Sequence, residues 1–291
     1  IAYVIVSSFA IVASLMAFRV MPHVPPPEWT QEEKQQSPLA VAAQEIKTMI
    51  TFLKYPSFVL MIAQGIFGSI PWLVIGNLNL YARLCGFEMW TLFWLSAPGL
   101  FGVVGGFLGG IVSDFLAKKM GPRGRPLTAM LTVAMGVPLQ FVMWYAIAPG
   151  SSLNNVWVFF LIQALFNLTA VWAQPGCNFP VLGQIVTGKD RNKVMCWEMA
   201  FENTMATIIG SNAVPYVIKA LGSSKITYDG HQDLEQARTL GIAQAIMICC
   251  PWLICFGIYS LLLWSFPVDI KRVDKDMALV EKKGAEPESQ I

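Results

Sequence analysis

Long apolar runs, separated by shorter polar segments, dominate this sequence. A helix that crosses a bilayer needs about 20 consecutive, mainly apolar residues. Charged residues make up 13% of the chain, compared with about 25% in soluble domains. Runs of suitable length lie at residues 1–20, 57–79, 90–113, 127–148, 155–186, 195–218 and 240–266. We therefore predict an all-α, multi-pass membrane protein with seven transmembrane helices.

The fifth run, residues 155–186, is longer than one straight span requires. Pro175, Gly176 and Pro180 lie within it. A proline inside a helix removes one backbone hydrogen bond and clashes with the preceding turn. We therefore expect a kink or a break in this helix.

The distribution of cations predicts how the chain is oriented. If Ile1 lies outside, sixteen of the 20 Lys and Arg residues fall in the inner segments, and the outer loops keep Arg83, Lys219, Lys225 and Arg238. Cytoplasmic loops carry an excess of Lys and Arg. The sequence therefore predicts a non-cytoplasmic N-terminal end and a cytoplasmic C-terminal tail.

Residues 21–56 form the longest loop and begin as a proline-rich, polar linker. From Leu39 to Leu53, apolar residues recur at helical spacing. This pattern indicates an amphipathic helix at the inner membrane surface, and the alternative is an N-terminal extension of the second span. The tail, residues 267–291, is highly charged, and we predict that it is disordered.

The stretch GGIVSDFLAKKMGPRGRP, residues 109–126, joins the third and fourth runs. Gly105, Gly106, Gly109 and Gly110 would let the third helix pack closely against a neighbour. Asp114 lies at the inner end of that helix, where the helix dipole disfavours a carboxylate. We therefore expect Asp114 to have a cation or the N-terminus of another helix as its partner.

This stretch resembles the loop motif of the major facilitator superfamily, which reads G-x-L-x-D-r-x-G-r-[rk]. The register is loose, with about two extra residues before the inner glycine. The positions that match are Gly110, Asp114, Lys118 or Lys119, Gly121, Arg123 and Arg125. In that family the motif's carboxylate and cations form a gating contact between the two halves of the transporter.

A second stretch, NFPVLGQIVTGKDRNKVMCWEMAFEN, is similar to the helix 10–11 region of plant and algal, spinster-like facilitator proteins. The matching positions are Asn178, Pro180, Ile185, Val186, Arg191 and Glu202. Gln184 replaces the usual Glu of that pattern and Thr187 the usual Pro, so the resemblance implies no role of that Glu for this chain.

Together the two motifs imply that the chain resembles helices 6–12 of a twelve-helix facilitator fold. Residues 1–20 would be helix 6, residues 21–56 the cytoplasmic central loop, residues 57–266 a six-helix bundle and residues 267–291 the tail. The missing helices 1–5 of the same protein would then be a partner of this chain.

Polar side chains inside apolar runs are candidates for a substrate cavity. Four of them are amides on the broken fifth helix, and Trp72 follows Pro71 in the middle of the second run. The candidates are Asn77, Trp72, Gln163, Asn167, Gln174 and Asn178. The alternative is that the amides bind neighbouring helices to one another.

Glu198, Glu202 and Arg191 are candidates for gating or coupling. The helix dipole favours acidic residues in the first turns of the sixth run, and this suffices to explain Glu198. Glu202 lies deeper, where it could pair with Lys193 or a basic loop, or couple transport to protons.

The resemblance implies transport of a small solute by alternating access, with membrane lipids as neighbours. The scarcity of charge in the spans favours a neutral or lipid-like solute. The motifs of common enzymes, metal sites and nucleic-acid sites are not found in the sequence, so we expect no enzyme activity, cofactor, metal or nucleic acid. Two other readings stay open: a seven-helix membrane receptor and a non-transporting membrane scaffold.

Overall fold

The computed structural model describes residues 37–186, 190–223 and 226–285, together with residues 11, 15, 16 and 19. Over these residues the chain is all-helical, with no strand, which confirms the all-α prediction. The predicted first span and the proline-rich linker lie almost entirely outside the described residues. Thr187, which departs from the family pattern, also lies outside them.

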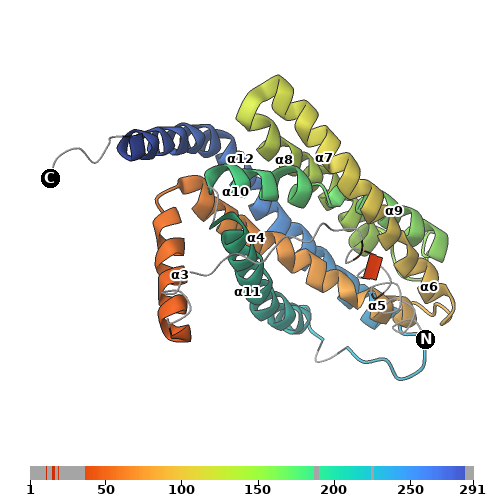
Figure 1. Ribbon diagram of the computed structural model, residues 1–291. Coiled ribbons are helices and arrows are strands. Elements are labelled where there is room, and N and C mark those ends of the chain that lie inside the picture. The colour runs from red at the N-terminus through yellow and green to blue at the C-terminus, as the bar shows by residue number, and fades with distance from the viewer. Residues whose placement is uncertain are drawn as a thin grey trace. The chain divides into compact units, whose positions relative to one another are not determined.

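The α-helices differ widely in length (Figure 1), and short 3-10 or π-helical turns connect several of them. The α-helices are α3 (Pro38–Phe52), α4 (Pro56–Val74), α5 (Leu78–Leu84), α6 (Thr91–Ser96), α7 (Phe101–Met120), α8 (Gly124–Phe141), α9 (Val156–Ala170), α10 (Phe179–Ile185), α11 (Arg191–Ala220) and α12 (Leu234–Ala285). The connecting turns are η1 (Ile75–Asn77), η2 (Ala97–Leu100), η3 (Gly121–Arg123), η4 (Val142–Ala146) and η5 (Gln174–Asn178).

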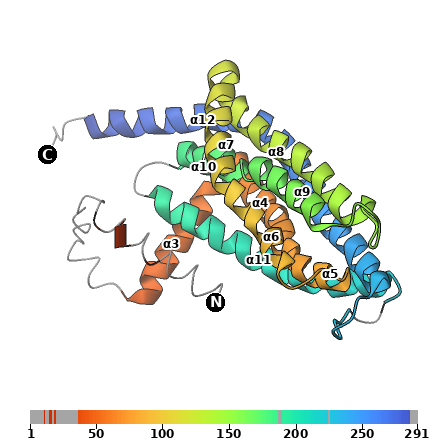
Figure 2. The same cartoon turned by 90° about the vertical axis from the view of Figure 1, so that its right-hand side faces the viewer.

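Four helical segments of the described residues are long and apolar enough to cross a membrane, and the chain is therefore a multi-pass membrane protein. They are Pro56–Leu84, Thr91–Ala146, Val156–Ile185 and Leu234–Asp276. The second contains α7 and α8, which turn back on each other at η3 (Figure 2). Gly121 has a φ of 64° at that turn, a conformation that favours glycine.

The sixth predicted run forms α11, which is 30 residues long but is not among these four segments. The reason is its composition, because α11 carries charged residues such as Glu198 and Glu202 together with several Asn, Thr and Ser residues, which lower its mean hydropathy. A helix with so many polar groups is stable in a membrane bundle when its polar face is turned toward other helices.

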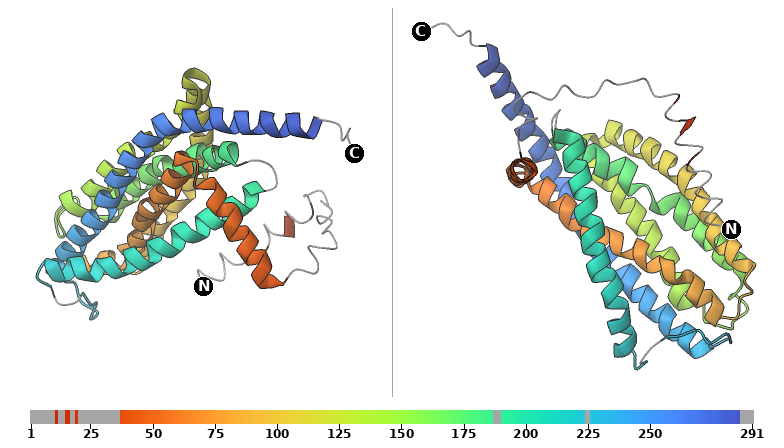
Figure 3. Two further views of the ribbon diagram at one scale, coloured as in Figure 1. Left: turned by 90° about the vertical axis from the view of Figure 1, so that its left-hand side faces the viewer. Right: turned by 60° about the horizontal axis from the view of Figure 1, so that its bottom comes forward.

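The helices from α4 onward form a bundle with α4 near its centre (Figure 1). Helix α4 packs most extensively against α12 and α11, α12 also packs against α8, and α7 packs against α8 and α9. Figure 3 shows α12 running along the bundle and continuing beyond it. The chain therefore brings α4, α8, α11 and α12 around one interior region.

Two of the four glycines of α7 make the close helix contact that the sequence predicts. A Cβ atom at Gly105 would lie 2.5 Å from the carbonyl oxygen of Asn167, and one at Gly109 would lie 2.7 Å from the Cα of Trp172. Gly106 and Gly110 have no such neighbour within 4 Å. The prediction was wrong for these two, because each lies one residue further along the helix and is therefore rotated by about 100° away from the contact with α9.

The predicted break in the fifth run is confirmed. Helix α9 ends at Ala170, a π-helical turn covers Gln174–Asn178, and α10 begins at Phe179. The carbonyl oxygen of Gly176 in this turn accepts a hydrogen bond from the hydroxyl of Ser113 on α7. A neighbouring helix thus satisfies a backbone group that the break leaves free, as buried backbone in a membrane requires.

The prediction of a disordered tail from residue 267 was wrong as far as Ala285, since α12 continues to that residue. Asp269 and Val273 are buried. Oδ2 of Asp269 accepts a hydrogen bond of 2.8 Å from the backbone N–H of Ser57, in the first turn of α4. Burial and this hydrogen bond hold the beginning of the tail helical, and residues 286–291 lie outside the described part.

Helix α3 is separate from α4, so the alternative of a continuous extension of the second span was wrong. Tyr55 has an extended backbone, with φ of −96° and ψ of 111°. Pro56 explains this conformation, because a residue that precedes proline avoids the helical region. The location of α3 at the membrane surface stays a prediction. Its apolar residues Leu39 and Ile50 are exposed.

Candidate functional site

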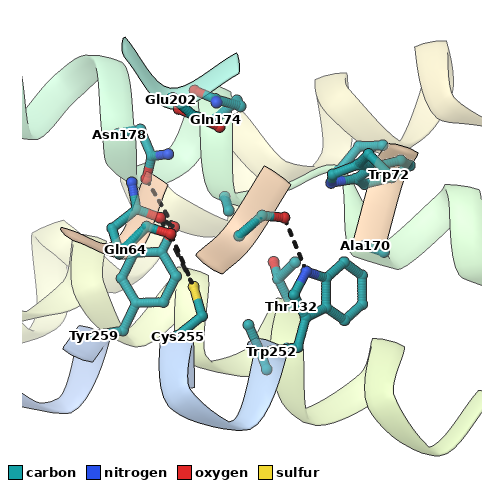
Figure 4. A pocket seen from close by; sticks show the side chains of 14 residues that line it. Gln64, Trp72, Thr132, Ala170, Gln174, Asn178, Glu202, Trp252, Cys255 and Tyr259 are labelled. Carbon is teal, nitrogen blue, oxygen red and sulfur yellow. Dashed lines mark hydrogen bonds between the residues drawn. The ribbon is translucent and has the colours of Figure 1, made fainter. Parts of the chain in front are cut away.

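A cavity of about 330 Å³ lies inside the bundle. Side chains from α4, α8, α11 and α12 line it, and the broken segment between α9 and α10 completes the lining (Figure 4). The cavity therefore lies where the long helices and the break in the fifth run meet.

Three of the six predicted cavity residues, Trp72, Gln174 and Asn178, line this cavity. Gln174 and Asn178 belong to the π-helical turn. The break therefore brings amide side chains to the cavity, as the spacing of the two amides around Pro175 predicted.

The other three predicted residues lie elsewhere. Gln163 is buried against Gln140, with 3.5 Å between Oε1 of Gln163 and Nε2 of Gln140. Asn167 donates a hydrogen bond of 2.8 Å to the carbonyl of Gln163 within its own helix. Asn77 lines a different, smaller cavity of about 260 Å³ beside α11. Gln163 therefore fits the alternative in which amides bind neighbouring helices to one another, whereas the hydrogen bond of Asn167 stays within α9.

A buried polar cluster forms one end of the cavity. The hydroxyl of Tyr259 donates to Oε1 of Gln64 at 2.6 Å and lies 2.9 Å from Oδ1 of Asn178. All three side chains are nearly inaccessible. Nε2 of Gln64 has no hydrogen-bond partner. The cluster thus joins α12, α4 and the broken segment. The Nε2 group of Gln64 remains as a buried donor that could bind a ligand.

Two carboxyl groups of α11 lie beside this cluster. Glu202 lines the cavity, and its Oε1 accepts a hydrogen bond from the hydroxyl of Ser69. Oε2 of Glu202 lies over Gly65, where an added Cβ would be 3.0 Å away. Glu198 is one turn earlier and 2% exposed, and neither of its oxygens has a hydrogen-bond partner. Both glutamates therefore lie inside the bundle rather than at its surface.

Aromatic rings form the other end of the cavity (Figure 4). The rings of Trp72 and Trp252 are 6.1 Å apart, and the ring of Trp252 stacks on Phe166 at 5.5 Å. The indole N–H of Trp252 donates to the carbonyl of Gly68 at 3.0 Å. Stacking and this hydrogen bond hold the orientation of the Trp252 ring.

Three further residues, Gln64, Trp252 and Tyr259, line the cavity although they were not among the predicted cavity residues. Gln64 and Tyr259 are polar side chains within long apolar runs, and this position in the sequence could have marked them as cavity candidates. Trp252 follows Pro251, as Trp72 follows Pro71. Trp72 was predicted because it follows a proline in the middle of an apolar run, and the same reasoning would have predicted Trp252.

The loop motif forms the ion pair that the position of Asp114 predicts. Oδ1 of Asp114 lies 3.4 Å from a guanidinium nitrogen of Arg125, and the same guanidinium lies 3.3 Å from the hydroxyl of Ser113. Because Ser113 also donates to Gly176, the motif is linked to the broken helix. Arg125 therefore connects the α7–α8 turn with the segment that lines the cavity.

The remaining motif residues lie around this pair. Gly110 has open space beside it, and Gly121 makes the turn. The ammonium of Lys119 lies 4.5 Å from the ring of Phe115, and the guanidinium of Arg123 lies 5.5 Å from the ring of Trp264. Lys118 lies in the last turn of α7, where a cation interacts favourably with the helix dipole.

Arg191, the third gating or coupling candidate, begins α11 and is exposed. It does not line the cavity. The structure therefore brings Glu198 and Glu202 together and leaves Arg191 apart from them.

Replacing Tyr259 with phenylalanine is expected to destabilise the bundle by about 1–3 kcal/mol, because the amides of Gln64 and Asn178 lose a buried partner. Tyr216→Phe is the matched control, since Tyr216 is 74% exposed. Thermal unfolding of the purified protein in detergent measures both effects. Equal unfolding temperatures for the two variants would show that the buried cluster contributes no stability.

Among the described residues, no group of three or more His, Cys, Asp and Glu side chains is arranged to hold a metal ion. Comparisons of the chain with protein-family models, with curated proteins and with solved structures found no match.

Proposed function

We propose that this chain forms the C-terminal half, with the preceding helix, of a major-facilitator-type transporter that moves a small solute by alternating access. The interior cavity, lined by a helix that breaks beside it, carries this proposal. Broken helices at the middle of a membrane are the usual place of substrate sites in transporters, because they present free backbone and amide groups. The seven spans and the predicted orientation belong to the same proposal.

The Asp114–Arg125 pair supports a gating role for the loop motif. It lies at the turn between α7 and α8, and Ser113 links it to the broken segment. A change at the loop would therefore reach the cavity through a short chain of contacts. The receptor and scaffold readings assign no role to this connection.

The proposal predicts what lies upstream of Ile1. Sequencing the transcript should reveal five further apolar runs, with a second Gly-Asp-basic loop between the second and third of them. An initiating Met directly before Ile1 would contradict the twelve-helix proposal and favour the receptor or scaffold reading.

Transport itself is tested with the full translation product reconstituted in vesicles. We expect saturable uptake of at least one member of a panel of radiolabelled, impermeant cations, sugars and anions. Asp114→Asn should slow this uptake while the protein stays folded. Solute binding without uptake would indicate a receptor, and neither binding nor uptake would indicate a scaffold.

A further inference from the structure

One end of the cavity is acidic. Among the described residues that line it, Glu202 is acidic and none is Lys, Arg or His. Glu202 is 7% exposed, and its Oε2 has no hydrogen-bond partner. A buried carboxylate is unfavourable unless a cation or several hydrogen-bond donors compensate it. A ligand that brings a cation or several N–H donors would therefore stabilise the carboxylate form of Glu202 in this cavity.

The groups around Glu202 are mainly unpaired acceptors. Both oxygens of Glu198 and Oε1 of Gln174 have no hydrogen-bond partner. Figure 4 shows Gln174 beside Glu202 at the polar end of the cavity. Acceptors gathered in this way suit a ligand that brings several N–H donors, as an ammonium group does.

An independent observation points to a ligand with further polar groups. Gln64 is 2% exposed and lines the cavity, yet its Nε2 has no partner. Buried amide nitrogens are nearly always hydrogen-bonded in folded proteins. A hydroxyl or ether oxygen on the ligand would satisfy this donor.

The aromatic end suits the body of the same ligand. The faces of Trp72 and Trp252 line the cavity, and tryptophan is the aromatic side chain that attracts cations most strongly. The rings would bury the apolar body of an organic ligand, which an inorganic ion does not have. A volume of about 330 Å³ accommodates a small organic molecule.

We propose that the cavity binds an organic cation, with its ammonium group at Glu202 and Gln174 and its apolar body against Trp72 and Trp252. This inference rests on the proposed transport function and names the substrate class of the same site. It replaces the neutral or lipid-like solute that the sequence favoured, because the carboxyl group of Glu202 lines the cavity and none of the other described lining residues is Lys, Arg or His.

Three probes of nearly equal shape test the charge preference: phenylethylammonium, 2-phenylethanol and phenylacetate. Binding to the purified full translation product in nanodiscs is measured by calorimetry, with empty nanodiscs as the reference for partitioning into lipid. We expect the cation to bind at least about tenfold more tightly than the alcohol, as a charge-assisted hydrogen bond and cation–π contacts provide. Phenylacetate should bind most weakly.

Glu202→Gln should remove this preference, since it keeps the shape of the side chain and deletes the charge. The ratio of cation affinity to alcohol affinity, which does not depend on the overall affinity of the variant, should fall toward one. Glu235→Gln is the matched control, because Glu235 is exposed in the first turn of α12. Glu198→Gln serves as a second variant if Glu202→Gln does not fold, and size-exclusion chromatography checks folding.

The outcomes separate this inference from the transport proposal. Equal binding of the three probes, or tightest binding of phenylacetate, overturns the cation preference while a solute-binding cavity remains. An unchanged cation preference in Glu202→Gln overturns the assigned position of the ammonium group. If no probe binds but the vesicles take up an anion or a sugar, the cation inference fails and the transport proposal stands.

Discussion

Replacing Gly105 with alanine should lower the free energy of unfolding of the bundle by about 1–3 kcal/mol, since the added methyl group overpacks the contact between α7 and α9. Its Cβ would lie 2.5 Å from the carbonyl oxygen of Asn167 and 2.7 Å from that of Leu168. Both neighbours are backbone atoms of a helix, which cannot rotate away as a side chain can. The two helices would have to separate.

Gly106→Ala is the matched control on the same helix. Gly106 has no neighbour within 4 Å that an added Cβ would meet, and alanine favours a helix over glycine by about 1 kcal/mol. Thermal unfolding in detergent compares the two variants. A loss of stability in Gly106→Ala equal to that in Gly105→Ala would contradict the assignment of the buried face of α7.

Replacing Asp269 with alanine should destabilise the bundle by about 1–3 kcal/mol, because it leaves the buried N–H of Ser57 without an acceptor. Asp269 is fully buried and accepts this hydrogen bond at the N-terminus of α4, which has no side-chain cap of its own. The carboxylate also faces the positive end of the α4 dipole. One side chain of α12 thus replaces a local cap.

Asp269→Asn should lose less stability, since the amide oxygen still accepts the hydrogen bond. Asp276→Ala is the control, because Asp276 pairs with Lys54 where both side chains are half exposed. Pairs of this kind contribute little. Urea unfolding followed by circular dichroism gives the order of stabilities. A loss at Asp276 as large as that at Asp269 would argue against the capping role.

The features that could be predicted from the sequence depend on local patterns. Apolar runs predicted the long helices, and Pro175 with Pro180 predicted the break, because both effects act within a few residues along the chain. The disfavoured carboxylate at Asp114 predicted a partner, which is Arg125 on the next helix.

Features that depend on packing between distant helices could not be predicted in this way. Nothing local distinguishes Gly105 from Gly106, and the difference arises from the face that α9 covers. The charge of the tail indicated disorder, but Asp269 finds a partner on α4, more than 200 residues earlier in the chain. Likewise, Tyr259 joins the cavity only through its contacts with Gln64 and Asn178.

The break between α9 and α10 has a consequence for biogenesis. The 15 residues of α9 extend about 23 Å at 1.5 Å per residue, less than the roughly 30 Å of hydrocarbon that a span must cross. Neither α9 nor the shorter α10 is therefore long enough to span the bilayer by itself. The two helices must be inserted into the membrane as one segment. Because α7 precedes this segment in the chain, the donor Ser113 is synthesised before the carbonyl of Gly176 that it satisfies.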